Sequence, residues 1–227
     1  MYAKMHGLAS FNSNIPVINL SNDARALSSK YWLSQFVAFL YRPNHFMLNT
    51  TIIPMVRTVF HDEFKEALFP KRFIGIFMRA GDKFKEAKLM SPNDFFERLD
   101  NRSRQFGISH VYINSDSLTN FRMIQELAGK SRPDLKLYFI SYNRSESGLT
   151  LAQLRMKFST RHIRELINIA LTDLWIQKHA HFWIGTLSSN WCRFINELRL
   201  ANGGYGVRYE TLDCPGENYR SGHCGLA

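Results

Sequence analysis

The sequence lacks the glycine-rich motifs that hold phosphates in the commonest nucleotide-binding proteins. It has no Gly-x-Gly-x-x-Gly run and no Gly-x-x-x-x-Gly-Lys-Ser/Thr run, which argues against NAD-dependent enzymes and P-loop NTPases. It has no Asp-x-Asp pair, the carboxylates with which a glycosyltransferase usually holds a nucleotide diphosphate through a metal ion. The 3 cysteines are too few for a disulfide-based mini-fold, and the 8 histidines show no zinc-ligand spacing with them.

Acidic residues are scarce relative to basic ones. The chain has 19 Asp and Glu against 29 Lys and Arg, a formal net charge of +10. This excess favours an anionic partner, which can be nucleic acid, an anionic membrane surface or a phosphorylated small molecule, and a merely solubilising surface charge is the alternative. No apolar run approaches the ~20 residues that span a bilayer, and residues 1–14 contain no apolar signal segment. We therefore expect no membrane span in this chain.

The chain does contain enough apolar sequence for a folded domain. Hydrophobic residues make up 45% of its 227 residues and charged residues 21%, a composition that excludes a disordered chain. The length corresponds to one ordinary domain with short appendages.

Strand-length apolar runs alternate with helical segments along most of the chain. Strands are predicted over 73–78, 110–114, 135–142 and 182–184, and helices over 29–42, 52–68, 91–106, 118–129, 161–179 and 190–200. This alternation is typical of an α/β fold, a Rossmann-like parallel sheet flanked by helices, with a helical N-terminal segment. The predicted divisions are a tail or partial element over 1–28, a helical segment over 29–72, a Rossmann-like domain over 73–200 and a C-terminal tail over 201–227.

The residues that follow the first strand form the first candidate site, because such folds bind ligands beyond the carboxyl ends of their strands. Arg79 and Lys83 lie in a glycine-containing turn and can both contact a phosphate, Arg79 as a planar fork and Lys83 as a point charge. Asp82 can orient them, and Glu86 can act as a base. The alternative is a solvated charged loop.

Polar residues also follow the second and fourth strands. Asp116 lies between two serines that are typical of a turn and a helix cap, and it can face a ligand at the sheet edge. The run from Gly185 to Ser189, which includes Ser188, leads into a helix, where free backbone N–H groups would form a cradle for an anion. An ordinary helix cap would explain the same residues.

Four stretches of the chain match motifs of one family. Trp32-Leu33-Ser34-Gln35-Phe36 leads to Arg42-Pro43, Ile74-Gly75 leads to Asp82-Lys83, Val111-Tyr112 leads to Ser115-Asp116, and Asp173 precedes Thr186-Leu187-Ser188-Ser189 and Cys192-Arg193. Together they resemble the core alpha-1,6-fucosyltransferases, which transfer fucose from GDP-fucose to N-glycans. The resemblance covers about residues 29–200, and it implies the donor-binding half of a GT-B-like fold.

The resemblance implies catalytic roles for the residues after the first strand. Arg79 and Lys83 would bind the diphosphate of GDP-fucose, Asp82 would support their loop, and Glu86 would be the catalytic base. The implied reaction inverts the anomeric centre in a single displacement and uses neither a metal ion nor a cofactor. The acceptor would be an N-glycan or glycoprotein, and the compartment would be the Golgi lumen.

The resemblance also implies substrate-binding roles further along the chain. Asp116 matches the first of two acids that follow the second strand in the family, and Asp173 matches the acid that hydrogen-bonds guanine. Ser188 and Ser189 lie where a serine contacts the diphosphate.

The sequence departs from the family at three positions. The second Arg of the family is Ala80 here, its His near guanine is Phe77, and its second acid after the second strand is Ser117. These departures favour a second hypothesis, a non-catalytic or degenerate relative that binds a nucleotide sugar or a glycan. A third hypothesis, a nucleic-acid binder explained by charge alone, ranks last because no binding motif is present.

Residues outside these motifs give further expectations. The family has an anchor, a stem, an acceptor-side region and an SH3-like domain that the flanks of this chain do not accommodate, so we expect a donor-binding half alone. Cys214 and Cys224 would form a small disulfide loop or stay free thiols, and Cys192 would be a buried thiol. We interpret His179 and His181 as surface or edge residues and not as metal ligands.

Overall fold

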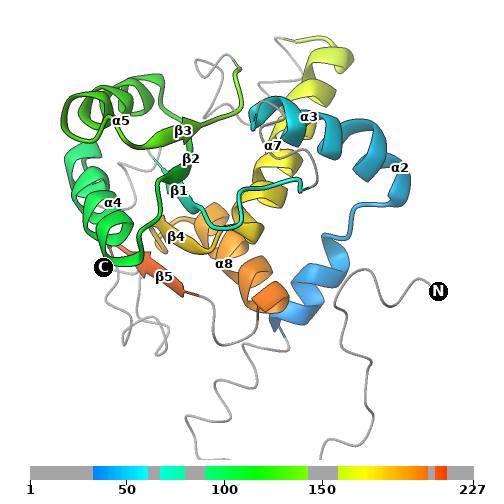
Figure 1. The fold of residues 1–227 in the computed structure, drawn as a ribbon. Coiled ribbons are helices and arrows are strands. Elements are labelled where there is room, and N and C mark those ends of the chain that lie inside the picture. Colours follow the sequence, from blue (N-terminus) through cyan, green and yellow to red (C-terminus); the bar gives the residue numbers. More distant parts are fainter. Residues whose placement is uncertain (1–32, 61–66, 80–89, 143–157, 204–207, 214–227) are drawn as a thin grey trace, which may run out of the picture.

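A five-stranded parallel sheet flanked by helices forms the centre of the molecule (Figure 1). The computed structural model describes residues 33–60, 67–79, 90–142, 158–203 and 208–213. The strands are β1 (Ile74–Met78), β2 (His110–Ser115), β3 (Lys136–Tyr138), β4 (Phe182–Gly185) and β5 (Arg208–Thr211). They lie in the order β3-β2-β1-β4-β5. This arrangement confirms the predicted α/β fold with a Rossmann-like parallel sheet.

The helices that connect the strands cover both faces of this sheet. They are α4 (Pro92–Phe106), α5 (Leu118–Ser131), α7 (Thr160–His179) and α8 (Asn190–Gly203). Ser91 begins α4 as predicted: its hydroxyl accepts from the Asp94 N–H at 3.2 Å, and the Asp94 carboxylate accepts from the Ser91 N–H at 2.8 Å. This reciprocal capping box satisfies two N–H groups at the start of the helix. Gly107 ends it with a φ of 60°, a conformation that favours glycine.

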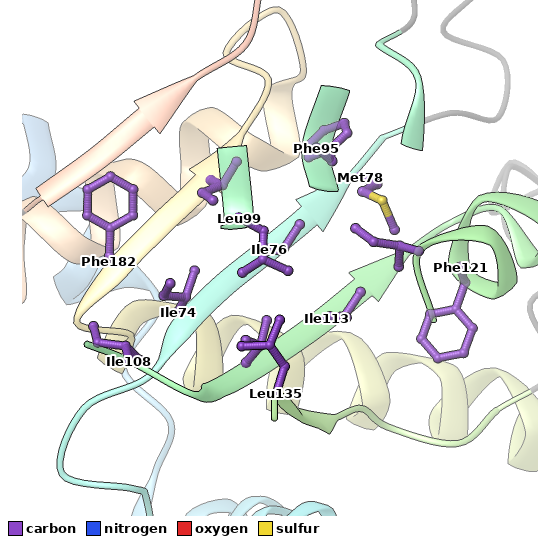
Figure 2. Close-up of a cluster of buried hydrophobic side chains, with 13 residues drawn as sticks. Ile74, Ile76, Met78, Phe95, Leu99, Ile108, Ile113, Phe121, Leu135 and Phe182 are labelled. Carbon is purple, nitrogen blue, oxygen red and sulfur yellow. The ribbon is translucent and has the colours of Figure 1, made fainter. Parts of the chain in front are cut away.

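Alternate residues of each central strand pack against different helices. The side chains of Ile74, Ile76 and Met78 face α4 and α5, where they pack with Phe95 and Phe121 in one buried cluster (Figure 2). The intervening residues face α7, α8 and the N-terminal helices, in two further buried clusters. Because both faces are covered, the central strands β1 and β4 contain no polar residue and are buried at every position, as the sequence predicted.

The N-terminal segment is helical but its bounds differ from the prediction. A helix is present over 33–40 within the described residues, and α2 (His45–Met47), a π-helical turn η1 (Leu48–Ile52) and α3 (Ile53–Val59) follow it. The predicted helix over 52–68 thus begins earlier, and α3 ends at Val59. Pro54 lies in the first turn of α3 and has no N–H to donate to the preceding turn. The wider π-helical turn η1 directly precedes α3.

Other bounds also differ from the sequence prediction. The strand expected over 135–142 is only three residues long, Lys136–Tyr138, and β5 forms where no strand was predicted. Both are edge strands of the sheet. Edge strands bury less side-chain surface, so a short polar run such as that of β5 gives little apolar signal. No helix within the described ranges is long and apolar enough to cross a membrane.

The switch point of the sheet lies between β1 and β4. From β1 the chain continues into α4 on one face, and from β4 it continues into α8 on the opposite face. The two connections therefore diverge at the carboxyl ends of these two neighbouring strands. In open α/β sheets this is where ligands bind, and the residues after Met78 and Gly185 therefore form the candidate site.

Gly75 in β1 permits the close approach of α7 to the sheet. A Cβ atom at this position would lie 2.5 Å from the Gln177 Oε1 atom and 2.9 Å from the Ala180 Cβ atom. We expect Gly75→Ala to lower the free energy of unfolding by about 1–3 kcal/mol, because overpacking forces the neighbours to move. Urea denaturation measures the change.

Gly129→Ala is the matched control for this substitution. Gly129 lies in α5, and an added Cβ would meet nothing within 4 Å. Because alanine is the better helix former, this variant should gain up to about 1 kcal/mol. Equal stability of the two variants would show that α7 can retreat from β1 without cost.

Candidate functional site

Arg79 and Asp116 form an ion pair at the carboxyl edge of the sheet. The register of the strands brings them together, because Met78 and Ser115 are aligned partners at the ends of β1 and β2 and each precedes one member of the pair. The Asp116 side chain is 8% exposed and that of Arg79 is 23% exposed. The carboxylate therefore fixes the guanidinium at the rim of the sheet, where it is accessible from solvent.

Two serines hold the turn that carries Asp116. The Ser115 hydroxyl donates to the Met78 carbonyl oxygen at 2.9 Å and accepts from the Ser117 N–H at 3.1 Å. The Ser117 hydroxyl accepts from the Asn120 N–H at 3.3 Å and begins α5. The position of the family's second acid is thus a helix cap here. The helix cap and the sheet-edge acid, which the sequence offered as alternatives, are therefore both present, in Ser117 and Asp116.

The other predicted residues after β1 lie outside the described residues. They are Ala80, Asp82, Lys83 and Glu86. Their predicted roles as diphosphate ligand, loop support and base stay predictions.

Asp173 lies in α7 beneath the sheet and is 1% exposed. The Tyr112 hydroxyl of β2 donates to its Oδ1 atom at 3.0 Å, and within the described residues its Oδ2 atom has no hydrogen-bond partner. Burial raises the pKa of Asp173 from 3.8 to about 6, although Tyr112, Asn114 and Trp191 nearby favour the ionised form. A buried carboxyl with a raised pKa is a common feature of binding and catalytic sites.

Aromatic and amide side chains surround Asp173 at the carboxyl end of β1. The ring of Phe77 packs on that of Trp191 in α8, with the ring centroids 6.5 Å apart. On β2, Asn114 accepts from the Tyr142 hydroxyl at 3.3 Å. The position of the family's histidine near guanine is thus a buried aromatic residue here. Asp173 is enclosed in the structure, so contact between this acid and a ligand requires movement of these side chains.

The loop between β4 and α8 carries an anion that the sequence analysis did not anticipate. The N–H groups of Leu187 and Ser188 donate to the Asp213 carboxylate, at 2.8 Å to Oδ1 and 2.9 Å to Oδ2. The sequence predicts that these amides are available to a ligand, whereas in the structure they donate to Asp213. Asp213 follows β5, so its proximity became predictable only once that strand was known to pair with β4.

The predicted serines of this loop differ in exposure. Ser188 is half-buried and lies beside Asp213, whereas Ser189 is buried and its N–H donates to the Thr186 carbonyl oxygen at 3.2 Å. The Ser189 carbonyl oxygen accepts from the Arg193 N–H at 3.0 Å, which begins α8. Ser189 therefore supports the helix start, and Ser188 lies nearer the switch point.

Cysteine and histidine side chains near this loop have structural roles. Cys192 is a buried free thiol, as predicted, and burial raises its pKa to about 11; Cys214 and Cys224 lie outside the described residues. His181 is exposed as expected, but His179 is half-buried and stacks on Phe69. Burial lowers the pKa of His179 to about 4, so it is neutral. Across the described residues, no three His, Cys, Asp or Glu side chains gather closely enough to hold a metal ion.

The described site thus offers a cation held by an acid, a buried acid among aromatic rings, and two backbone amides at a helix start. The first and third flank the β1–β4 switch point, and all belong to the carboxyl half of the sheet. Cations and helix starts stabilise phosphate charge, and a buried carboxylate recognises paired N–H donors such as those of a purine base. This combination is suited to a nucleotide.

Comparison with known proteins gives matches in fold only. No protein-family model matches the chain, and no curated protein matches its sequence. A solved structure of POFUT1 in complex with GDP-fucose is similar at 10% sequence identity and a TM-score of 0.46, over 77% of this chain and 48% of that chain. NodZ alpha-1,6-fucosyltransferase soaked with GDP-fucose is similar at 15% identity and a TM-score of 0.37, over 65% of this chain and 41% of that chain. The chain spans about half the length of the solved structures that it matches.

Proposed function

We propose that this chain is the donor-binding part of a GDP-fucose-dependent glycosyltransferase, similar to the alpha-1,6-fucosyltransferases that modify N-glycans. The observation that carries the proposal is the Arg79–Asp116 pair beside the β1–β4 switch point. A guanidinium held at this edge is suited to a diphosphate. The motif resemblance over residues 29–200 supports the same donor.

In the proposed reaction the sugar–phosphate bond breaks as an acceptor hydroxyl attacks the anomeric carbon from the opposite side. The GDP that leaves gains negative charge, which Arg79 and Lys83 stabilise. Glu86 removes the proton of the attacking hydroxyl, and Asp82 supports the loop. Ser188 lies on the diphosphate side and Asp173 on the guanine side. The donor set contains cations and N–H groups, so the proposed reaction uses neither a metal ion nor a cofactor.

A second candidate function is binding of a nucleotide sugar or glycan without turnover. The enclosed Asp173, the buried Phe77 and the occupied amides of Leu187 and Ser188 favour it. Each of these features lowers the access of a nucleotide to the site. The two candidates share the binding site and differ only in transfer.

A transfer assay separates the two candidates. The protein is incubated with GDP-fucose and a biantennary N-glycan, and free GDP and fucosylated glycan are quantified. Equal release of GDP and formation of product is expected for the enzyme, because the displacement links the two. Saturable binding of GDP-fucose or of the glycan without either product would support the binding protein, and absence of binding to both ligands would contradict both candidates. The proposal includes an acceptor of the N-glycan class, which the same transfer assay tests. It also includes a location in the Golgi lumen, which imaging of the protein in cells tests.

A further inference from the structure

The amides in front of α8 already hold an anion, and that anion is the carboxylate of Asp213. Leu187 donates to Oδ1 at 2.8 Å and Ser188 donates to Oδ2 at 2.9 Å. Each oxygen of the carboxylate therefore receives one of two successive backbone N–H groups. Successive amides at a helix start bind phosphate in the same way. The contact shows that this loop binds an anion, and it identifies a competitor for any other anion.

The strand pairing delivers Asp213 to this position. Gly185 of β4 is the aligned partner of Thr211 in β5, and the Leu212 N–H donates to the Gly185 carbonyl oxygen at 3.1 Å. The Thr211 hydroxyl donates to Asp213 Oδ1 at 2.7 Å. The carboxylate is thus held by its own strand end as well as by the amides that it accepts from. The pairing of β5 with β4 therefore fixes the position of Asp213 in front of α8.

We propose that Asp213 is an internal competitor at the anion site, a carboxylate that a phosphate-bearing ligand has to displace. The identity of that ligand as a nucleoside diphosphate rests on the proposed function. A carboxylate tethered to the neighbouring strand competes at a high effective concentration, and its charge opposes a phosphate directly. A free phosphate has no other contact to offset this competition. A nucleotide that also binds Arg79 does, so it can bind despite the competition, although Asp213 lowers the affinities of both ligands by the same factor.

Displacement requires no chemistry and no large change of the sheet. The Asp213 carboxylate exchanges its N–H donors for water as the ligand takes them, and β5 can stay paired with β4. The apparent affinity for the ligand is lowered by the fraction of molecules in which the carboxylate occupies the amides. Neutralising this carboxylate should therefore tighten binding, the opposite of what loss of an ordinary binding residue does.

Asp213→Asn tests the proposal because asparagine keeps the shape and removes the charge. Affinities for inorganic pyrophosphate and for GDP are measured by calorimetry at one fixed salt concentration. We expect both ligands to bind the variant about tenfold more tightly than the unchanged protein, the effect of removing one like charge from a partly solvated site. Glu126→Gln is the charge-matched control, since Glu126 is exposed on α5; its affinities should change less than twofold.

A second variant keeps the test informative if Asp213→Asn unfolds. Thr211→Val removes the hydroxyl that donates to Asp213 and leaves the carboxylate in place, so a smaller tightening of about threefold is expected. In amide NMR spectra, pyrophosphate should shift the Leu187 and Ser188 resonances at lower concentration in either variant than in the unchanged protein. Unchanged or weaker pyrophosphate binding by folded variants would overturn the proposal and make Asp213 a purely structural contact.

The two ligands separate failure of this inference from failure of the proposed function. Tighter pyrophosphate binding by Asp213→Asn, with no preference for GDP over pyrophosphate in any variant, would support the competition and contradict the nucleotide. GDP binding by the unchanged protein that Asp213→Asn does not tighten would contradict the competition and leave the nucleotide site standing. Failure of every variant to bind either ligand would contradict both.

Discussion

Arg79→Ala should abolish measurable GDP binding and, with it, transfer of fucose. Arg79 is held at the sheet rim by Asp116, which is itself 8% exposed. Its removal takes away the cation that we propose faces the diphosphate, and it leaves a nearly buried carboxylate without this partner. Truncation of one member of a buried charge pair at a binding site costs about 2–5 kcal/mol, which corresponds to a loss of affinity between about thirtyfold and several thousandfold. Calorimetry with GDP measures the loss.

Arg79→Lys and Arg104→Ala complete this experiment. Lysine keeps the charge but not the planar fork, so Arg79→Lys should bind GDP with an affinity between those of the unchanged protein and Arg79→Ala. Arg104 pairs with Asp100 along α4 and its side chain is 63% exposed, so Arg104→Ala removes the same charge from a solvated position and should change GDP affinity less than twofold. An unchanged GDP affinity in Arg79→Ala would contradict the assignment of the diphosphate to this edge of the sheet.

The location of Arg79 and Asp116 at strand ends was predicted from the sequence because two local signals coincide, whereas the ion pair between them was not predicted. Each residue directly follows an apolar run of strand length, and parallel strands end at one edge of a sheet. The alternation of strands and helices also sufficed to predict the fold, since β1 contains no polar side chain, β2 contains the apolar run 111–113, and Ser91 and Asp94 are typical of a helix start. Short-range patterns thus located the cation and its acid.

The environment of Asp213 and the depth of Asp173 could not be predicted from such patterns. Asp213 meets Leu187 only because β5 pairs with β4, and the run Arg208–Thr211 has the half-exposed character of an edge strand, with no apolar signal. The helix around Asp173 was predicted, but periodicity cannot show that Tyr112 reaches it from the sheet. Both features are contacts between residues far apart in the sequence. They depend on tertiary packing, which local propensity does not encode.

Asp173→Asn should stabilise the fold and weaken GDP binding at the same time. Burial raises the pKa of this carboxyl from 3.8 to about 6, so the folded state favours the protonated form. Between these two values the folded state binds more protons than the unfolded state, and the contribution of Asp173 to stability falls as pH rises. Above pH 6 the full cost is present, about 3 kcal/mol at 1.4 kcal/mol per pH unit. Asparagine carries no charge and avoids this cost.

Urea denaturation at two pH values measures this gain. At pH 7.5 the free energy of unfolding of Asp173→Asn should exceed that of the unchanged protein by up to about 3 kcal/mol, and at about pH 2.5, below both pKa values, the difference should vanish because the acid is then protonated in both states. Glu126→Gln, on an exposed face of α5, should stay within about 0.5 kcal/mol at both pH values. A gain at pH 7.5 that persists undiminished at about pH 2.5 would show that the raised pKa of Asp173 is not its cause.

The effect of Asp173→Asn on GDP binding tests whether the buried carboxylate recognises the guanine base. An ionised carboxylate accepts from two neighbouring N–H donors of a guanine edge, whereas an asparagine amide offers one acceptor and one donor and leaves one of them unmatched. Asp173→Asn should therefore weaken GDP binding by about tenfold or more and leave pyrophosphate binding unchanged, because only GDP carries the base. Arg79→Ala, in contrast, should weaken both. This pair of results would assign a carboxylate that costs the fold about 3 kcal/mol to recognition of the base. Equal loss of both ligands in Asp173→Asn would instead place its effect in the shape of the sheet edge.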